Sequence, residues 1–336
     1  MPADTVVFGE VLLRLSAPGR ELMLQFGRLD VHVGGAEANV AVALAGLGHR
    51  VRMASAVSDN PLGRAAVTFL RGQGVDCSGI AQREGRMGLY FLTPGAGLRA
   101  SEVVYDRAGS SFAQADGYEF DWPVLFAGAK RLHLSGITPA LGPRSADAAL
   151  AAVDAGRAAG LSVSFDCNYR ARLWDSWDSD PRGVLTQLVG SADVLFGNHR
   201  DVSLLLGREF GGEGAARRRE AAEAAFAVFP NLRVIASTAR HVEDADRHRI
   251  AARIDTPDGE HQTEEVTVSG IVDRIGAGDA FAAGVLDGLI AGHDLDRIAR
   301  SGLALGCLKH SIPGDASLFR REDIDAFLAG GLDVRR

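Results

Sequence analysis

The chain has 336 residues, of which 46% are hydrophobic and 24% charged, which is the balance of a globular protein and excludes global disorder. It carries 36 Lys and Arg against 43 Asp and Glu, and the net charge of −7 argues against nucleic acid or an anionic membrane as the main partner. Its three cysteines are widely spaced and form no CxxC pair, which argues against disulfides or a zinc site. No signal peptide or long apolar run is evident, so we expect a cytoplasmic protein.

Two early segments have the pattern of short strands. Residues 11–33 and 88–107 alternate apolar and polar side chains over short lengths, which predicts exposed, twisted, antiparallel strands. Between them, the pair Gly34 and Gly35 opens a helix of small residues that ends near Gly46. We therefore expect a small β-sheet formed by 11–33 and 88–107, projecting from a core formed by 1–10, 34–87 and 108–336.

From residue 130 onward, strand-like and helical segments alternate. The expected strands are 131–135, 161–166, 193–197, 232–236 and 249–254, and the expected helices are 144–159, 217–228, 277–291 and 295–310. This alternation predicts right-handed crossovers and an α/β fold of three layers, with a mostly parallel sheet between helices. The polar segment from His241 to His248 is expected to be an exposed loop with solvated histidines.

The segment VDRIGAGDAF, residues 272–281, predicts a phosphate site. Its glycines allow a tight turn whose N–H groups point inward, and the helix that follows adds the positive end of its dipole. Gly276, Ala277 and Gly278 would bind a phosphoryl group there. Asp279 would accept the proton of an attacking alcohol, and the helix dipole is expected to lower its pKa. The alternative is an ordinary helix N-terminus with a capping aspartate.

The segment GGAEANVA, residues 34–41, predicts a second ligand contact. Two glycines let backbone amides approach a ligand closely, and Asn39 follows about one turn later. The alternative is a turn and a tightly packed helix in which Asn39 satisfies a local backbone group. The sequence has no GxxxxGK[ST], GxGxxG after a strand, HExxH or GxSxG, so the GAGD turn is the remaining candidate for a phosphate site.

The two glycine segments resemble the two signatures of the ribokinase / phosphofructokinase-B family of carbohydrate kinases, and the resemblance covers essentially the whole chain. It implies a ribokinase-like fold, a substrate lid made by the small sheet, and the use of ATP and Mg²⁺. DCNYR with LW (residues 166–174) resembles a stretch shared by 2-keto-3-deoxygluconate kinases and some fructokinases, and KHSIPGD (residues 309–315) resembles a stretch typical of 2-keto-3-deoxygluconate kinases. That implies phosphorylation of 2-keto-3-deoxy-D-gluconate at its terminal 6-hydroxyl.

The resemblance also assigns residues to each substrate. A sugar acid carries a carboxylate, which needs a cation or aligned amides once water is excluded. The residues implied to hold the sugar acid are Gly34, Gly35, Asn39, Tyr90, Tyr105, Arg107, Arg170 and Asp315, and Asp279 would act with Gly276, Ala277 and Gly278 in catalysis. Those implied to contact the nucleotide are Asn198, Ser237, Thr238, Gly276 and Gly278, and no metal site made of protein ligands alone is expected.

The nucleotide segments depart from the family pattern. Asn198 begins NHRD where the family has N-x-x-E, and STAR at 237–240 replaces a K-x-G segment, so Arg240 could substitute for the missing charge. Three alternatives stay open: a kinase for fructose, a kinase for another sugar acid, or a sugar-acid-binding protein without catalysis. Because exposed lid edges tend to be covered, we expect a homodimer or a larger homo-oligomer.

Overall fold

The computed structural model describes residues 3–211 and 213–330. Its large sheet contains β1 (Thr5–Phe8), β4 (Val51–Ser58), β5 (Asp76–Arg83), β8 (Arg131–Ser135), β9 (Ser162–Asp166), β10 (Val194–Phe196), β11 (Val234–Asp244), β12 (Arg247–Thr256), β13 (Gly259–Gln262) and β14 (Val266–Ser269). The strand order is β13-β12-β11-β10-β9-β8-β1-β4-β5, and β14 also pairs with β12. Every pair from β11 to β5 is parallel, whereas β12, β13 and β14 join antiparallel. The prediction of a mostly parallel α/β sheet is confirmed.

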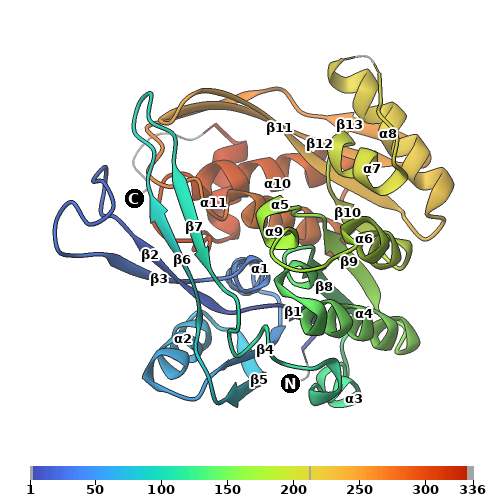
Figure 1. Ribbon diagram of the computed structural model, residues 1–336. Coiled ribbons are helices and arrows are strands. Elements are labelled where there is room, and N and C mark those ends of the chain that lie inside the picture. Colours follow the sequence, from blue (N-terminus) through green and yellow to red (C-terminus); the bar gives the residue numbers. More distant parts are fainter. Residues whose placement is uncertain (1–2, 212, 331–336) are drawn as a thin grey trace.

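Helices cover both faces of this sheet (Figure 1). One layer contains α1 (Ala36–Gly46), α2 (Pro61–Gly72), α9 (Ala277–Ile290), α10 (Leu295–Lys309) and α11 (Arg321–Leu328), and the other contains α3 (Trp122–Leu125), α4 (Pro143–Ala158), α6 (Pro181–Gly190), α7 (His199–Leu206) and α8 (Gly214–Val228). The shorter helices are α5 (Ala171–Trp174) and two single 3₁₀ turns, Gly117–Glu119 and Pro139–Leu141. Successive residues of β1 point to opposite layers, since Val7 packs in one core while Val6 and Phe8 pack in the other. This explains why the consecutive residues Val6, Val7 and Phe8 are all apolar.

A second, four-stranded sheet lies at one end of the molecule (Figure 1). It contains β2 (Leu12–Ser16), β3 (Asp30–Gly34), β6 (Gly88–Thr93) and β7 (Glu102–Asp106), in the order β3-β2-β6-β7. The outer pairs are antiparallel as expected, but β2 and β6 are parallel, so that expectation is wrong for the central pair. The reason is topological: β2 follows β1 and β6 follows β5, and the two leave the large sheet in the same direction. That 11–33 and 88–107 act as a separate lid stays a prediction.

The segment 241–248 is part of a β-hairpin, so the expectation of a loop is wrong. β11 and β12 pair through this segment, with His241 opposite Arg249 and Val242 opposite His248. His248 is also buried, and its ring lies edge-on to the ring of His310 at 5.9 Å between centroids. The polar composition misled the sequence interpretation because the end of the hairpin is exposed to solvent, with residues 240–243 all exposed, so a paired strand there looks like a loop.

Across residues 3–211 and 213–330, the structure contains no helix with the length and apolarity that a membrane span requires.

Candidate active site

The carboxyl ends of the parallel strands carry a row of polar residues. Glu10 lies just beyond β1, Ser135 ends β8, Asp166 ends β9 and Asn198 follows β10. Ligands of open α/β sheets bind at this edge. A cavity of about 530 Å³ lies there between the sheet edge, the N-terminus of α9 and the small sheet. Ten of the residues expected in the site line it: Gly35, Asn39, Tyr90, Tyr105, Arg107, Arg170, Gly276, Gly278, Asp279 and Asp315.

The turn that starts α9 presents free N–H donors. Gly276 has φ +77°, and a Cβ there would overlap the carbonyl oxygen of Asp315, so only glycine fits. The Ala277 N–H donates to the Arg274 carbonyl at 3.3 Å. Within the described part of the chain, the N–H groups of Gly278 and Asp279 have no backbone acceptor. We call residues 276–279 the anion turn, because its free donors and the helix dipole favour a negatively charged ligand.

The carboxyl group of Asp279 lies beside these donors. Asn39 donates from Nδ2 to Oδ2 of Asp279 at 2.7 Å. Burial raises the pKa of Asp279 to about 7, and the nearby charges of Glu37 and Asp315 add to this effect while the Asn39 hydrogen bond opposes it. The expectation that the helix dipole lowers this pKa is therefore wrong, since the cost of burying the charge is larger. Asp279 has the proton affinity of a base that works near neutral pH.

Sequence interpretation missed Glu37, which is fully buried beneath Asp279. Its Oε1 accepts hydrogen bonds from the Ser135 N–H at 2.9 Å, the Ser135 hydroxyl at 2.7 Å and the Thr138 hydroxyl at 3.0 Å. Burial raises the pKa of Glu37. The sequence did carry a signal for a role of Glu37 in the site. Glu37 lies two residues before Asn39 in GGAEANVA, in a helix of otherwise small and apolar residues.

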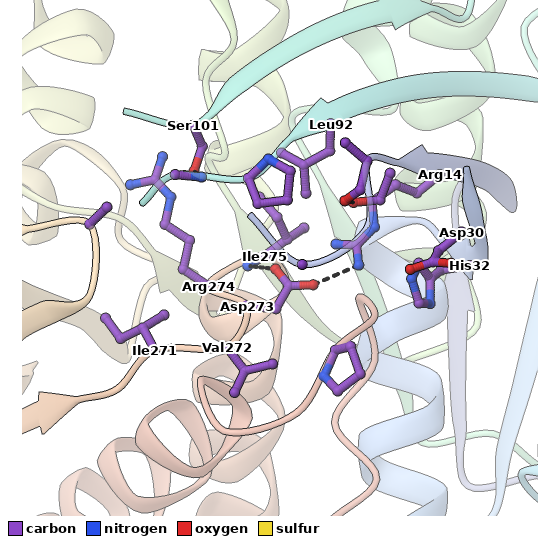
Figure 2. A pocket seen from close by; sticks show the side chains of 17 residues that line it. Arg14, Asp30, His32, Leu92, Ser101, Ile271, Val272, Asp273, Arg274 and Ile275 are labelled. Atoms are coloured by element: carbon purple, nitrogen blue, oxygen red, sulfur yellow. Dashed lines mark hydrogen bonds and ion pairs between the residues drawn. The ribbon is translucent and has the colours of Figure 1, made fainter. Parts of the chain in front are cut away.

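A second residue that sequence interpretation missed is Arg14 of β2, which connects the small sheet to the site through ion pairs. Arg14 is 1% exposed and contacts Oδ2 of Asp273 at 2.6 Å, as Figure 2 shows, and Oδ1 of Asp315 at 2.9 Å. Tyr90 donates its hydroxyl hydrogen to Oδ2 of Asp315 at 2.6 Å. Gly34 packs against the same carboxylate, where a Cβ would overlap Oδ2. Both Asp315 oxygens are thus engaged, and the Asp315–Tyr90 pair presents a fixed polar edge to the cavity.

The two arginines expected to hold a carboxylate differ in their surroundings. Arg107 is 4% exposed, and its Nε donates to Oε2 of Glu10 at 2.7 Å. The Ser110 hydroxyl donates to the other Glu10 oxygen. Arg170 is exposed at the cavity rim, with a long hydrogen bond of 3.4 Å to the Tyr169 carbonyl. Arg170 is therefore free to bind an anion, whereas Arg107 can offer only its terminal nitrogens.

Two further carboxyl groups, those of Asp166 and Asp201, lie at this edge of the sheet. The pKa of Asp166 is raised to about 8, chiefly by burial and in addition by the negative charges of Asp279 and Asp201. Asn168, which also lines the cavity, has φ +36° and donates its N–H to Oδ1 of Asp166 at 3.1 Å. Asp201 accepts the Asn198 N–H at 2.7 Å in the capping box of α7. The sequence segments around 166 and 198 indicated both places, but not that the negative charge of Asp201 acts on Asp166.

A narrower cavity of about 120 Å³ adjoins the first one. Gly278 and Arg240 line both cavities, and Thr238 lines the narrow one. Its other walls are largely apolar, with Ile250, Phe281 and Leu303 among them. Among the described residues, Asn198 and Ser237 line neither cavity, so their expected nucleotide contacts stay predictions.

The comparison with protein families decides the class. The family model described as pfkB family carbohydrate kinase matches residues 2–319. The chain belongs to the pfkB family of carbohydrate kinases. The recognition made from the two glycine segments, and the kinase class that it implied, are thereby confirmed.

This pfkB kinase is 31% identical over 331 residues to a 2-dehydro-3-deoxygalactonokinase of Haloferax volcanii, and the match covers 98% of each of the two chains. It is 30% identical over 339 residues to a 2-dehydro-3-deoxygluconokinase of Bacillus subtilis, over 100% of this chain and 98% of the relative. The crystal structure of a 2-dehydro-3-deoxygluconokinase of Thermotoga maritima superposes with a TM-score of 0.92 at 36% identity, over 97% of this chain and 99% of that one. The ribokinase-like fold is thus confirmed.

Proposed function

We propose that this pfkB kinase transfers the γ-phosphoryl group of ATP to the terminal 6-hydroxyl of 2-keto-3-deoxy-D-gluconate, also called 2-dehydro-3-deoxy-D-gluconate. One observation carries the proposal: the Asp279 carboxyl group, with a pKa near 7, lies beside the free N–H groups of the anion turn in the cavity that Arg170 faces. The names of the relatives above support a 2-dehydro-3-deoxy sugar acid as the acceptor.

In this mechanism Asp279 accepts the proton of the 6-hydroxyl as the new P–O bond forms. Asn39 holds the carboxylate in one orientation through its 2.7 Å hydrogen bond. The N–H groups of Gly278 and Asp279 stabilise the charge on the transferred phosphoryl group. Because phosphoryl transfer depends mostly on positioning and charge, these fixed donors supply most of the rate. The small sheet excludes water, which would otherwise compete as acceptor.

The residues present fit ATP with Mg²⁺. The narrow apolar cavity beside the anion turn suits the flat base of a nucleotide, with Thr238 at its wall. Asp166 and Asp201 are two mutually repelling carboxyl groups at the sheet edge, and Mg²⁺ binds to one or two carboxylates together with phosphate oxygens and water. Mg²⁺ would neutralise part of the triphosphate charge there. Within the described chain, no group of three or more His, Cys, Asp or Glu side chains could hold a metal ion by itself.

A coupled ADP-release assay over a panel of acceptors tests the proposal. We expect ADP release to depend on 2-keto-3-deoxy-D-gluconate, with the galactonate epimer as the nearest competitor and with little release for fructose or ribose. Preferential use of fructose would replace the sugar acid with a neutral ketose. Tight binding of the sugar acid without ADP release would support a binding protein instead.

Arg170→Ala should weaken use of the sugar acid selectively. A hydrogen bond to a charged group contributes ~1.5–3 kcal/mol, so we expect kcat/KM for the sugar acid to fall roughly 10- to 10²-fold. The effect on a neutral acceptor such as fructose should be much smaller. Steady-state kinetics with both acceptors measure this, and Arg172→Ala, an exposed arginine two residues away and outside this cavity, is the matched control.

Arg107→Ala should show the same selectivity, but it also leaves the buried Glu10 carboxylate without its ion pair. A thermal unfolding curve must therefore accompany the kinetics. Equal losses for acid and neutral acceptors, in either variant, would contradict a role in binding the carboxylate.

The pH profile should report the Asp279 base. At saturating MgATP we expect kcat/KM for the sugar acid to rise with pH through an apparent pKa of about 7, because only ionised Asp279 accepts the proton. Asn39→Ala removes the hydrogen bond that lowers this pKa, so its acid limb should move to higher pH. An acid limb that stays at the same pH in Asn39→Ala would argue that another group titrates.

We also propose that the kinase forms a homodimer through the small sheet. The cross-strand neighbours Val31, Leu15, Phe91 and Val104 form an apolar row on one face of this sheet, and Val31 and Val104 are 60% and 55% exposed. A second copy of the chain would cover this row and its edge strands. Light scattering, which measures the mass of the particle in solution, tests whether the kinase is a dimer.

The three buried, unpaired cysteines support a reducing cytoplasm as the location of the kinase.

A further inference from the structure

Two arginines that the proposed mechanism leaves unused line the cavity that contains Asp279. Arg240 comes from β11, and Arg274 lies just before the anion turn, so they approach from different elements. Among the described residues, neither guanidinium group forms an ion pair or a side-chain hydrogen bond, whereas the nearby Arg14 and Arg107 each hold a carboxylate. Figure 2 shows the Arg274 side chain extending away from Asp273 and from Arg14.

Neither guanidinium group has an ion-pair partner among the described residues, although the carboxyl groups of Asp166, Asp279 and Asp315 line the same cavity. Arg240 is exposed to solvent on one side, and partial desolvation together with the like charges of Arg274 and Arg170 lowers its pKa. Because the pKa values of Asp166 and Asp279 are raised, these carboxyl groups balance the charge of the three arginines only in part, and an anion of several negative charges would balance the rest. A sugar acid brings a single carboxylate, whereas a triphosphate brings three or four negative charges. The arrangement therefore exceeds what the acceptor alone requires.

The position of each arginine matches a different part of a polyphosphate. Arg240 and Gly278 line both cavities, so they lie where a chain of phosphates would pass from the narrow apolar cavity toward Asp279. Arg274 shares the large cavity with Asp279 and also lines a neighbouring cavity beside the small sheet, but it does not line the narrow one. The sequence has two lysines, and the ammonium group of Lys309 donates to the carbonyls of Asp273 and Ile312. Arginine is thus the available cation.

We propose that Arg240 binds the inner phosphates of the nucleotide and that Arg274 binds the γ-phosphoryl group during its transfer. This inference rests on the proposed function. In the transfer, the bond from the γ-phosphorus to the bridging oxygen breaks and leaves its electrons on ADP. The bond from the sugar oxygen forms, and its proton goes to Asp279. Both arginines stay protonated and donate paired hydrogen bonds to phosphate oxygens, for which a planar guanidinium group is suited.

Calorimetric titration with AMP, ADP and the non-hydrolysable analogue AMP-PNP separates the two roles. Arg240→Gln should lower the affinity for ADP and for AMP-PNP roughly 10- to 10²-fold. Arg274→Gln should lower the affinity for AMP-PNP by a similar factor, while its affinity for ADP should stay within about twofold of the wild type. Both should leave AMP within about twofold. The matched control is Arg64→Gln, an exposed arginine of α2 whose ion-pair partner is Asp59. Thermal unfolding verifies that each variant is folded.

Three outcomes would overturn the inference: equal losses for AMP and AMP-PNP, no loss for any nucleotide, or loss of sugar-acid binding with unchanged nucleotide affinities. The last outcome would assign these arginines to the carboxylate. Failure of the proposed function looks different. If the nucleotide series behaves as expected but no sugar acid supports ADP release, the substrate assignment fails and the arginine roles stand.

Discussion

Asp279→Asn should lower turnover with the sugar acid by roughly 10²- to 10⁴-fold, the usual scale for the loss of a general base. The substitution preserves the size of the side chain but removes its ability to accept a proton. Nucleotide affinity should change little, since the free N–H groups of the anion turn belong to the backbone. Rapid-quench measurement of the phosphoryl-transfer step gives the turnover directly. Asp296→Asn, an exposed aspartate of α10, is the control.

The same variant should change the pH dependence of stability, which tests the raised pKa of Asp279. The folded Asp279 carboxyl group has a pKa raised from 3.8 to about 7, so between these values the folded protein binds more protons than the unfolded chain. Its contribution to stability therefore falls as the pH rises through this range. Asp279→Asn removes that decline and should unfold at a higher temperature than the wild type at pH 8, but not at pH 4. Near-normal turnover would remove the catalytic role.

Gly276→Ala should damage both the fold and the activity. Gly276 has φ +77°, where an alanine costs ~1–2 kcal/mol, and its Cβ would overlap the Asp315 carbonyl oxygen. The anion turn must then shift away from the segment that carries Asp315. We expect a loss of about 2 kcal/mol or more in the free energy of unfolding, and at least about a 10²-fold fall in kcat, the scale of losing oriented backbone donors.

Gly278→Ala should lower the affinity for ATP without destabilising the fold, in contrast to Gly276→Ala. A Cβ at Gly278 meets no atom within 4 Å, but this position lines both cavities, so the added methyl group would stand where phosphate is expected. We expect its unfolding temperature to stay near that of the wild type while ATP affinity falls. Chemical denaturation and nucleotide titration of both variants measure the difference. A normal ATP affinity in Gly278→Ala would place the nucleotide elsewhere.

The parts of the site that local sequence determines could be predicted. The glycine spacing in GAGD predicted the anion turn at 276–279, because a left-handed glycine followed by a helix is a local feature. GGAEANVA likewise predicted a helix whose Asn39 reaches the site, and the structure places Asn39 against Asp279. The alternation after residue 130 predicted the parallel strands, because buried βαβ units repeat over short distances.

The parts that depend on distant contacts could not be predicted. Arg14 and Asp273 are 259 positions apart, and nothing in LLRLS indicates that its arginine is buried against two aspartates. The pKa of Asp279 depends on its burial and on the charge of Glu37, so the local helix dipole alone gave the wrong direction. The parallel pairing of β2 with β6 depends on how β1 and β5 leave the large sheet.

The structure of a ternary complex with 2-keto-3-deoxy-D-gluconate and AMP-PNP tests the central claim most directly. The account predicts that the terminal 6-hydroxyl lies within hydrogen-bond distance of an Asp279 carboxylate oxygen, and that γ-phosphate oxygens accept from the N–H groups of Gly278 and Asp279. A sugar acid bound with its terminal hydroxyl away from Asp279, or a γ-phosphate held outside the anion turn, would contradict it.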